Sequence, residues 1–570
     1  MDWPAYLLVK AQIRTQADEL RVHTAAERSK NQEWSSELVD LDLALARVAE
    51  RMGDTSRLES TEEGNLLMAE SVLTRIQLYC NEIADVQTQL MEAGLRKKDA
   101  ARLLMLAAKI ETLTIWLNYA LAVPREDLFN LPQSHARWVQ LHTKAAHLCP
   151  DEPEALASGI KAMEDSVLFA NAVMHRGFQF THPITKEVAI GASVLLYKLS
   201  PDLIRAQAML NYARPSIEST LALWNATDSA LMAPLLERGL PDISFQKLIY
   251  LPRVAEPVCD YVVGNHGVTQ GDPSFSLKPD VKKVAVRLVA PFKLPAFLRK
   301  SRPGWFSCCT SREFEEVEPT VSVERLIIHV HAGGFIAMTS RSHQNYIRLW
   351  ATTTQTPILC VDYRLAPEFP FPAALDDVWQ TYVWVLQHAE RYLGINPAKI
   401  VLTGDSAGGN LAMGCVIKAI EMGVRLPDGL LLNFPALNMW KEAYTPSFLL
   451  SLDDVIMHHT FLRLCHNCYI KDPLLDTKDN HYLSPLFAST TLLSQFPPTR
   501  IMVGTRDPLL DDCWRLLERL NEAGADAELE VFEGLVHGGM NSSIRNGVKD
   551  GIRMVERCGL LLDTLLGKMA

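Results

Sequence analysis

A serine flanked by glycines is the residue of this chain best suited to nucleophilic chemistry. The apolar run Ile400-Val-Leu-Thr leads into Gly404-Asp-Ser406-Ala-Gly408, and a helical pattern follows directly. Gly-x-Ser-x-Gly between a strand and a helix is typical of a nucleophile elbow, where a strained turn makes the serine hydroxyl project outward. The alternative is a glycine-rich turn whose serine only caps the helix. The strand-turn-helix context favours Ser406 as a nucleophile.

A serine hydroxyl needs a base to take its proton and a carboxylate to orient that base. With an elbow of this kind, the acid and then the histidine follow the serine along the chain. Asp507 follows the β-like run 500–503, and His537 lies in a glycine-flanked loop after the β-like run 527–532. We therefore predict that Ser406, His537 and Asp507 form a catalytic triad.

Other acids and histidines compete for these roles. Asp511 and Asp512 follow the predicted acid closely, but they fall inside a helical pattern, and we expect them to be solvated acids in its first turn. The chain has 16 histidines, and most histidines in proteins are structural or solvated. We interpret four others in the second half in that way: His458, His459, His466 and His481.

Acyl transfer also needs N–H donors directed at a developing oxyanion. The β-like run 327–330 ends in His331-Ala332-Gly333-Gly334, whose small residues expose their backbone. We predict that the N–H groups of Gly333, Gly334 and Ala407 form an oxyanion hole. His331 is expected to support the loop rather than to take part in chemistry. The alternative is a glycine-rich loop that only turns the chain.

The two halves of the chain differ in their hydrophobic periodicity. Residues 1–280 carry apolar residues at three- and four-residue spacing, as in 41–49, 101–122 and 209–232, which predicts a mainly helical domain. This half contains no catalytic motif. We interpret it as a domain that packs on the rest of the protein, and the alternative is a regulatory or lipid-contacting role. Residues 281–570 alternate short β-like runs with helical patterns, which predicts a doubly wound, mostly parallel sheet. The strands are expected at 284–289, 326–330, 357–362, 399–403, 429–434, 500–503 and 528–532, with helices near 372–391, 408–421, 510–523 and 547–566.

The motifs of the second half together resemble the hormone-sensitive lipase family of α/β-hydrolases. His331-Ala-Gly-Gly-Phe335 is similar to the family's His-Gly-Gly-Gly loop, and Gly404-Asp-Ser-Ala-Gly408 is similar to its elbow. The helical first half corresponds in size and position to the N-terminal domain of the animal members. Further similar segments are 340–343, 362–368, 371–377, 426–429, 446–452 and 507–512.

This resemblance implies an α/β-hydrolase fold and a lipase or esterase that acts on acyl esters of neutral lipids, such as diacylglycerol and cholesteryl esters. It also implies a cytoplasmic enzyme recruited to lipid droplets, without a metal or organic cofactor. Two departures from the family stand out. Ala332 replaces a glycine of the loop, and only about 65 residues separate Trp440 from Asp507, where animal members carry a long phosphorylated insertion.

Two rival functions are weighed against this one. A soluble carboxylesterase for short acyl chains would need the same triad, but the long helical half disfavours it. A non-catalytic small-molecule receptor on the same fold is disfavoured by His537, because such receptors lose the triad histidine.

Composition narrows the functional class further. The 570 residues carry 56 Lys and Arg against 67 Asp and Glu, a formal net charge of −11, which argues against a nucleic-acid binder. Eleven scattered cysteines suit a reducing compartment. We expect no export signal and no membrane-spanning helix, hence a cytoplasmic protein with at most peripheral contact to a droplet or membrane surface. A homodimer is compatible with the sequence.

Two segments suggest further contacts. Residues 291–306 mix aromatic and basic residues, a composition that suits either an interfacial segment or a solvated linker. Cys465 and Cys468, with His458, His459 and His466 nearby, have part of a zinc-binding pattern. A second ligand pair with suitable spacing is missing, so we predict no metal site.

Overall fold

The computed structural model describes mainly the second half of the chain. The described residues are 323–439, most of 445–542, and 549–567, preceded by 14–15, 18–19, 21–22, 165–173, 185, 188–194, 208, 216–225, 237, 239–254 and 283–294. The helical patterns at 41–49 and 101–122 and most of the segment 291–306 lie outside them. By proximity of Cα atoms the chain divides into two compact units, residues 1–223 with 442–462, and residues 224–441 with 463–570.

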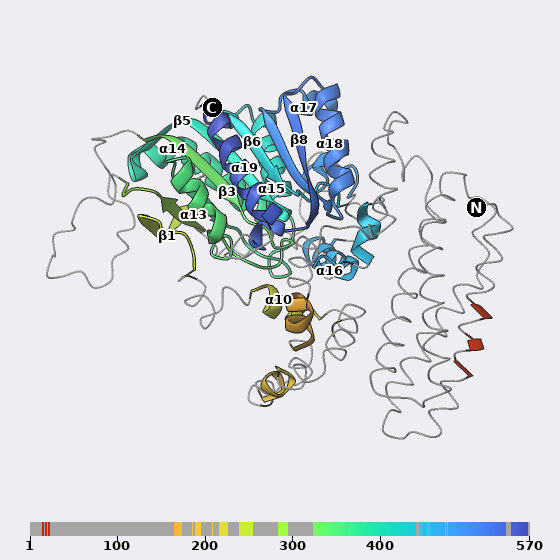
Figure 1. The fold of residues 1–570 in the computed structure, drawn as a ribbon. Coiled ribbons are helices and arrows are strands. Elements are labelled where there is room, and N and C mark those ends of the chain that lie inside the picture. Colours follow the sequence, from red (N-terminus) through yellow and green to blue (C-terminus); the bar gives the residue numbers. More distant parts are fainter. Residues whose placement is uncertain are drawn as a thin grey trace. The chain divides into compact units, whose positions relative to one another are not determined.

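An eight-stranded sheet forms the centre of the second unit (Figure 1). The strand order is β1-β2-β4-β3-β5-β6-β7-β8; β1 and β2 are antiparallel to each other, β2 is antiparallel to β4, and the others are parallel. The doubly wound, mostly parallel sheet predicted from the sequence is confirmed. The strands are β1 (Phe245–Pro252), β2 (Lys283–Ala290), β3 (Val323–Val330), β4 (Ile358–Asp362), β5 (Ile395–Asp405), β6 (Gly429–Asn433), β7 (Thr499–Arg506) and β8 (Ala527–Val536).

Helices cover both faces of the sheet. The chain passes from β3 through α13 to β4, and then back across β3 through α14 to β5. Because such crossovers are right-handed, this reversal of direction puts α13 and α14 on opposite faces. The packing agrees, since α13 contacts α19 whereas α14 contacts α15. The helices are α13 (Gln344–Thr353), α14 (Ala373–Leu393), α15 (Ala407–Glu421), α16 (His459–Tyr469), α17 (Thr490–Leu493), α18 (Leu510–Glu522) and α19 (Lys549–Leu565), with α10 (Ile217–Trp224) ahead of the sheet.

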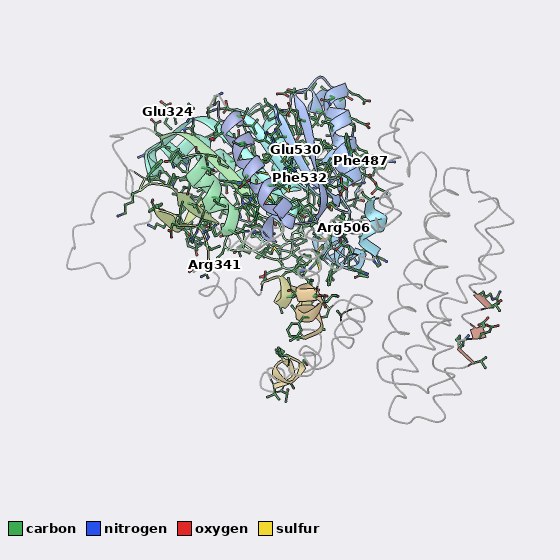
Figure 2. The ribbon with its side chains drawn as sticks, viewed as in Figure 1. Glu324, Arg341, Phe487, Arg506, Glu530 and Phe532 are labelled. Atoms are coloured by element: carbon green, nitrogen blue, oxygen red, sulfur yellow. The ribbon has the colours of Figure 1, made fainter. Side chains whose placement is uncertain are left out.

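Local sequence explains the central elements. β6 is apolar up to its last residue, Asn433, and all its residues are buried, as expected of a parallel strand covered on both faces. α14 ends at Gly394, which adopts the left-handed conformation that favours glycine after a helix, with φ 69°. On β8, Glu530 and Phe532 are two residues apart and share one face of the strand (Figure 2), where Glu530 pairs with Arg557 of α19 at 2.6 Å.

Several elements of the second half were not predicted, and β1 and α13 are two of them. β1 lies ahead of the proposed boundary between residues 280 and 281, and it pairs with β2 along its whole length. As an edge strand it exposes Leu248 and Tyr250, so its alternation does not resemble a buried strand. α13 is only 10 residues long, and it begins and ends with pairs of polar residues, so its helical pattern is short. Residues 264–280, a stretch rich in glycine and polar residues between β1 and β2, lie outside the described residues.

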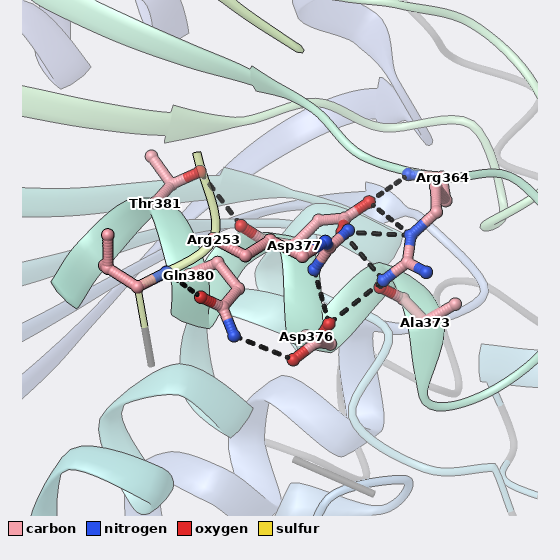
Figure 3. A network of polar contacts seen from close by, with 8 residues as sticks. Arg253, Arg364, Ala373, Asp376, Asp377, Gln380 and Thr381 are labelled. Atoms are coloured by element: carbon pink, nitrogen blue, oxygen red, sulfur yellow. Dashed lines mark hydrogen bonds and ion pairs between the residues drawn. The ribbon is translucent and has the colours of Figure 1, made fainter. Parts of the chain in front are cut away.

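A buried ionic cluster connects β1's downstream end to the start of α14 (Figure 3). The guanidinium groups of Arg253 and Arg364 both contact the carboxylates of Asp376 and Asp377. The Arg364 backbone N–H also donates to Asp377 at 2.7 Å. Two cations facing two anions leave no net charge in the cluster, and burial is the main reason why the pKa of Asp376 is raised.

The cluster predicts a large stability loss when one cation is removed. Arg364→Met should lower the free energy of unfolding by about 3 kcal/mol, because two buried carboxylates then share a single cation. As a control, Lys399→Met breaks the exposed Lys399–Asp428 pair and should cost less than about 1 kcal/mol. Urea unfolding of the full chain measures both, and equal effects would contradict this view of the cluster.

Candidate active site

Three side chains from distant loops form a hydrogen-bonded row beside the sheet. His537 Nε2 lies 3.0 Å from Ser406 Oγ, and His537 Nδ1 lies 2.9 Å from an oxygen of Asp507. They follow β5, β7 and β8, whose carboxyl ends point to the same edge of the parallel sheet. All three are buried, with Ser406 5% and His537 4% exposed. The structure therefore brings together the three residues that the sequence nominated, in the order expected of a nucleophile, a base and an acid.

The turn at Ser406 is strained, and adjacent glycines make it sterically allowed. Ser406 has φ 53° and ψ −116°, values that a side-chain-bearing residue rarely adopts. A Cβ on Gly404 would lie 2.3 Å from the carbonyl oxygen of Gly408, and one on Gly408 would lie 2.1 Å from the carbonyl oxygen of Val330. The Ser406 N–H donates to Asn433 O at 2.9 Å, which ties the turn to β6. Only glycine fits on either side of this serine.

Asp405 anchors the elbow through a network of buried hydrogen bonds. One oxygen of Asp405 accepts hydrogen bonds from His329 Nε2, at 2.8 Å, and from the hydroxyl of Tyr346. The other oxygen accepts from Asn433 Nδ2 at 2.7 Å. Burial alone would raise the pKa of Asp405, but the neighbouring His329 and these hydrogen bonds together hold it below its usual value. The sequence analysis did not identify this network, although Asp405 precedes the nucleophile and His329 lies two residues before His331.

The acid and the base are each oriented by a second contact. Asp507 is fully buried, and its Oδ1 accepts the Leu509 N–H at 2.9 Å. The ring of Phe434 meets the His537 ring edge-on, with 4.9 Å between centroids. These contacts restrict both side chains to the orientations that the hydrogen-bonded row needs.

The two competing acids lie elsewhere, and one expectation about them is wrong. Asp511 is fully buried and Asp512 is 8% exposed, so neither is a solvated acid. Burial raises the pKa of Asp512, and Arg515 pairs with it at 3.2 Å. The first turn of α18 faces the protein interior, which a helical pattern with charged residues does not reveal. The carboxylate that holds His537 is that of Asp507.

The glycine loop begins at His331, next to the elbow, because a Cβ on Gly408 would lie 2.6 Å from the carbonyl oxygen of His331. Gly333 has φ 120° and Gly334 has φ 59°, and the carbonyl of Gly333 accepts the N–H groups of Ile336 and Ala337. Among the described residues, no protein acceptor is found for the N–H of Gly333 or Gly334. Ala407 begins α15, in the first turn, where backbone N–H groups have no intrahelical partner. Three N–H groups are thus available where an oxyanion hole was predicted.

Two buried histidines contact the start of this loop at Ala332. The His331 ring stacks on Tyr363 with 4.1 Å between centroids, and its Nδ1 lies 2.6 Å from Ala332 O. His343 Nδ1 lies 2.9 Å from Thr339 O, and its Nε2 accepts the Ala332 N–H at 3.3 Å. Burial lowers the pKa of both His331 and His343 to about 3, so both rings are neutral near neutral pH. His343 was not predicted to have this role, although it closes the segment 340–343 that carried part of the family resemblance.

The remaining candidate ligands do not form a metal site within the described part of the chain. There, no group of three or more His, Cys, Asp or Glu side chains is arranged to hold a metal ion. His466 contacts the Met439 carbonyl, and His481 pairs with Glu421 at 3.0 Å. Cys465 is buried, and a Cβ on Gly334 would lie 2.5 Å from its sulfur. Cys465 is thus a packing residue of the glycine loop.

Comparisons with known proteins show the family to which the second half of the chain is similar. Residues 327–541 match the family with the α/β-hydrolase fold. Hormone-sensitive lipase of Bos taurus is 34% identical over 257 residues, which are 44% of this chain and 33% of that protein. The human hormone-sensitive lipase is 45% identical over 144 residues, which are 25% of this chain and 13% of that protein. An esterase of Acinetobacter venetianus is 30% identical over 221 residues, which cover 39% of this chain and 69% of the esterase.

This chain belongs to the hormone-sensitive lipase-like α/β-hydrolases. The matched part includes the glycine loop, the elbow and the acid, and it reaches past His537. This α/β-hydrolase spans only about a third of the length of the bovine relative. Within the described residues, no helix is both long enough and apolar enough to span a bilayer.

Because His331 and His343 are neutral in the folded chain, we expect the free energy of unfolding to fall in acid. On unfolding, the pKa of each imidazole returns to about 6.5, so the unfolded chain takes up protons that the folded chain excludes. The contribution of these two histidines to the free energy of unfolding is complete above about pH 6.5, and it is lost progressively as the pH falls toward 3. Each such histidine adds at most about 1.4 kcal/mol per pH unit to the slope.

His343→Gln removes one of these two groups and retains an acceptor for Ala332. Urea unfolding at a series of pH values between 5 and 7 should therefore give a shallower slope for the variant than for the wild type. An unchanged slope would show that His343 does not exclude a proton in the folded chain.

Proposed function

We propose that this chain is a carboxylic ester hydrolase that forms an acyl-enzyme on Ser406. The observation that carries the proposal is the row Ser406–His537–Asp507, with 3.0 Å between the hydroxyl and the imidazole, beside a loop with unused glycine N–H groups. A nucleophile, an oriented base and oxyanion donors are the parts that acyl transfer needs.

In the first half-reaction, Ser406 Oγ attacks the ester carbonyl carbon while His537 Nε2 takes the hydroxyl proton. Asp507 keeps the proton on Nδ1 and thus leaves Nε2 free to act as the base. The carbonyl oxygen becomes an oxyanion and is stabilised by the N–H groups of Gly333, Gly334 and Ala407. When the tetrahedral intermediate collapses, the ester C–O bond breaks and the alcohol leaves with the proton from His537.

In the second half-reaction, water replaces the alcohol. His537 takes a proton from water, the resulting hydroxide equivalent attacks the acyl-enzyme, and the Ser406 hydroxyl is restored as the fatty acid leaves. None of these steps needs a metal ion or an organic cofactor, because the protons move between Ser406, His537 and the substrate alone.

We further propose that the esters are those of neutral lipids, including diacylglycerol and cholesteryl esters. The similarity to proteins named hormone-sensitive lipase, at 34% and 45% identity, supports this choice. The enzyme would act in the cytoplasm and contact a lipid droplet or membrane surface peripherally. The aromatic and basic composition of residues 291–306 is suited to such contact.

A soluble carboxylesterase for short acyl chains is the second candidate. The similarity to the Acinetobacter venetianus esterase, which this chain covers over 69% of its length, favours it. Both candidates use the same catalytic residues, so only the substrate separates them.

The triad assignment predicts two different losses of activity. Ser406→Ala should abolish ester turnover without unfolding the chain, because the nucleophile is lost. Asp507→Asn should lower kcat by about 10⁴-fold, because an amide favours the wrong tautomer of His537. The matched control is Asp511→Asn, a buried acid four residues away, which should retain most of its kcat. A larger loss in the control than in Asp507→Asn would overturn the choice of acid.

The lipid proposal predicts a preference for an interface. The rate of hydrolysis of diacylglycerol should rise sharply above the concentration at which an emulsion forms, and it should exceed the rate on a soluble short-chain ester. Titration of released fatty acid measures both reactions. Turnover of the short-chain ester alone would support the soluble carboxylesterase instead.

A further inference from the structure

The glycine loop is strained beyond its glycines. Two side-chain-bearing residues in it, Phe335 and Met338, have φ 66° and 67°, in the left-handed region that favours glycine. Together with Gly333 and Gly334, four of the six residues 333–338 have positive φ. Such a backbone persists only where surrounding contacts hold it. The orientation of the glycine N–H groups therefore depends on what holds residues 335–338.

The contacts of Phe335 account for the first of these positions. Its carbonyl accepts the Ala366 N–H at 2.9 Å, and its ring stacks on Tyr469 with 3.9 Å between centroids. Both partners lie within the same compact unit as the loop. These two contacts hold Phe335.

Met338 is held by a residue that precedes the whole sheet. The Met338 N–H donates to the side-chain Oδ1 of Asn225 at 2.6 Å. Next to it, the ring of Trp224 lies 3.3 Å from where a Cβ of Gly334 would be. Trp224 and Asn225 are thus adjacent in sequence and contact the two ends of the strained turn. They belong to the same compact unit as the loop and lie outside the residues 327–541 that match the family.

We propose that Asn225 is a positioning residue for the oxyanion loop, an inference that rests on the proposed ester hydrolysis. Its side-chain carbonyl keeps Met338 in the left-handed conformation. The turn closed by the bonds from Ile336 and Ala337 to the Gly333 carbonyl then keeps its shape. That shape aims the N–H groups of Gly333 and Gly334. Without the acceptor, Met338 relaxes toward ordinary φ values, and the glycine N–H groups move from the oxyanion position.

A second link between the same segments serves as a control. Glu237 pairs with Arg341 at 2.7 Å, and both side chains are partly exposed, at 42% and 32%. Arg341 lies beyond the strained turn, on the lower side of the domain in Figure 2. An exposed ion pair contributes little to stability. The Glu237–Arg341 pair should therefore affect the glycine loop much less than the hydrogen bond from Met338 to Asn225 does.

The test compares three variants of the full chain. Asn225→Leu keeps the branched shape of the side chain but removes the acceptor, Asn225→Asp keeps an acceptor oxygen, and Glu237→Gln weakens the exposed link. Each is assayed for kcat and KM on a soluble ester and for inhibition by an aryl trifluoromethyl ketone. Ser406 adds to that ketone to give a hemiketal oxyanion, and the hydroxyl proton passes to His537. Its inhibition constant therefore reports on the oxyanion donors directly.

We expect Asn225→Leu to lower kcat about tenfold with little change in KM. It should also raise the inhibition constant of the trifluoromethyl ketone by a similar factor. Asn225→Asp and Glu237→Gln should stay within about twofold of the wild type in both measurements. A purely structural loss would lower the active fraction and leave the inhibition constant unchanged, which would overturn the proposal. So would a tenfold loss in Asn225→Asp or a wild-type kcat in Asn225→Leu.

The same experiment separates this inference from the function on which it rests. A wild type that neither hydrolyses the ester nor binds the ketone would overturn the proposed hydrolase, and the role of Asn225 with it. An active wild type with an equally active Asn225→Leu would overturn the role of Asn225 alone.

Discussion

The site depends on a contact between backbones at Gly408, where there is no room for a side chain. The position of a Cβ on this residue lies 2.1 Å from the carbonyl oxygen of Val330, at the end of β3. The helix that follows the nucleophile can therefore approach the strand that leads into the glycine loop. This contact fixes Ser406 and the oxyanion donors relative to each other, because both segments start from the same pair of neighbouring strands.

Buried polar groups then set the orientation of each part. Asp405 connects β5 to His329 of β3, Tyr346 of α13 and Asn433 of β6, and Asn433 in turn accepts the Ser406 N–H. A charge in such a place is tolerated because hydrogen bonds from all sides satisfy it. The strained nucleophile is thus held by groups from both sides of its strand. Helix α13, which lies on the face opposite α14 and α15, contributes to this support.

Much of the fold could be predicted because parallel strands leave a strong local signal. β4 and β6 are buried on both faces, so they are apolar up to their last residues, and the elbow motif begins at the end of β5. Edge strand β1 lacks that signal because one side of it meets solvent. The burial of Asp511 was mispredicted for a related reason, since which face of α18 packs inward is decided by the fold rather than by the helix.

The residues proposed to be catalytic could be nominated from their order along the chain, but the residues that support them could not. The triad follows a fixed order of serine, acid and histidine, and each member lies after a recognisable strand. The contacts that position the glycine loop join residues far apart in the sequence: 113 positions separate Asn225 from Met338. No periodicity or spacing encodes such a pair, and His343 is visible only once the loop is folded around it.

The central claim is that His537 activates Ser406 as the nucleophile. The most direct measurement is labelling of the intact chain with a fluorophosphonate ester, followed by mass-spectrometric mapping of the modified residue. The account predicts one phosphonyl group per chain, on Ser406, with labelling slowed at least a hundredfold in His537→Ala. Labelling of a different residue, or a rate that does not depend on His537, would contradict it.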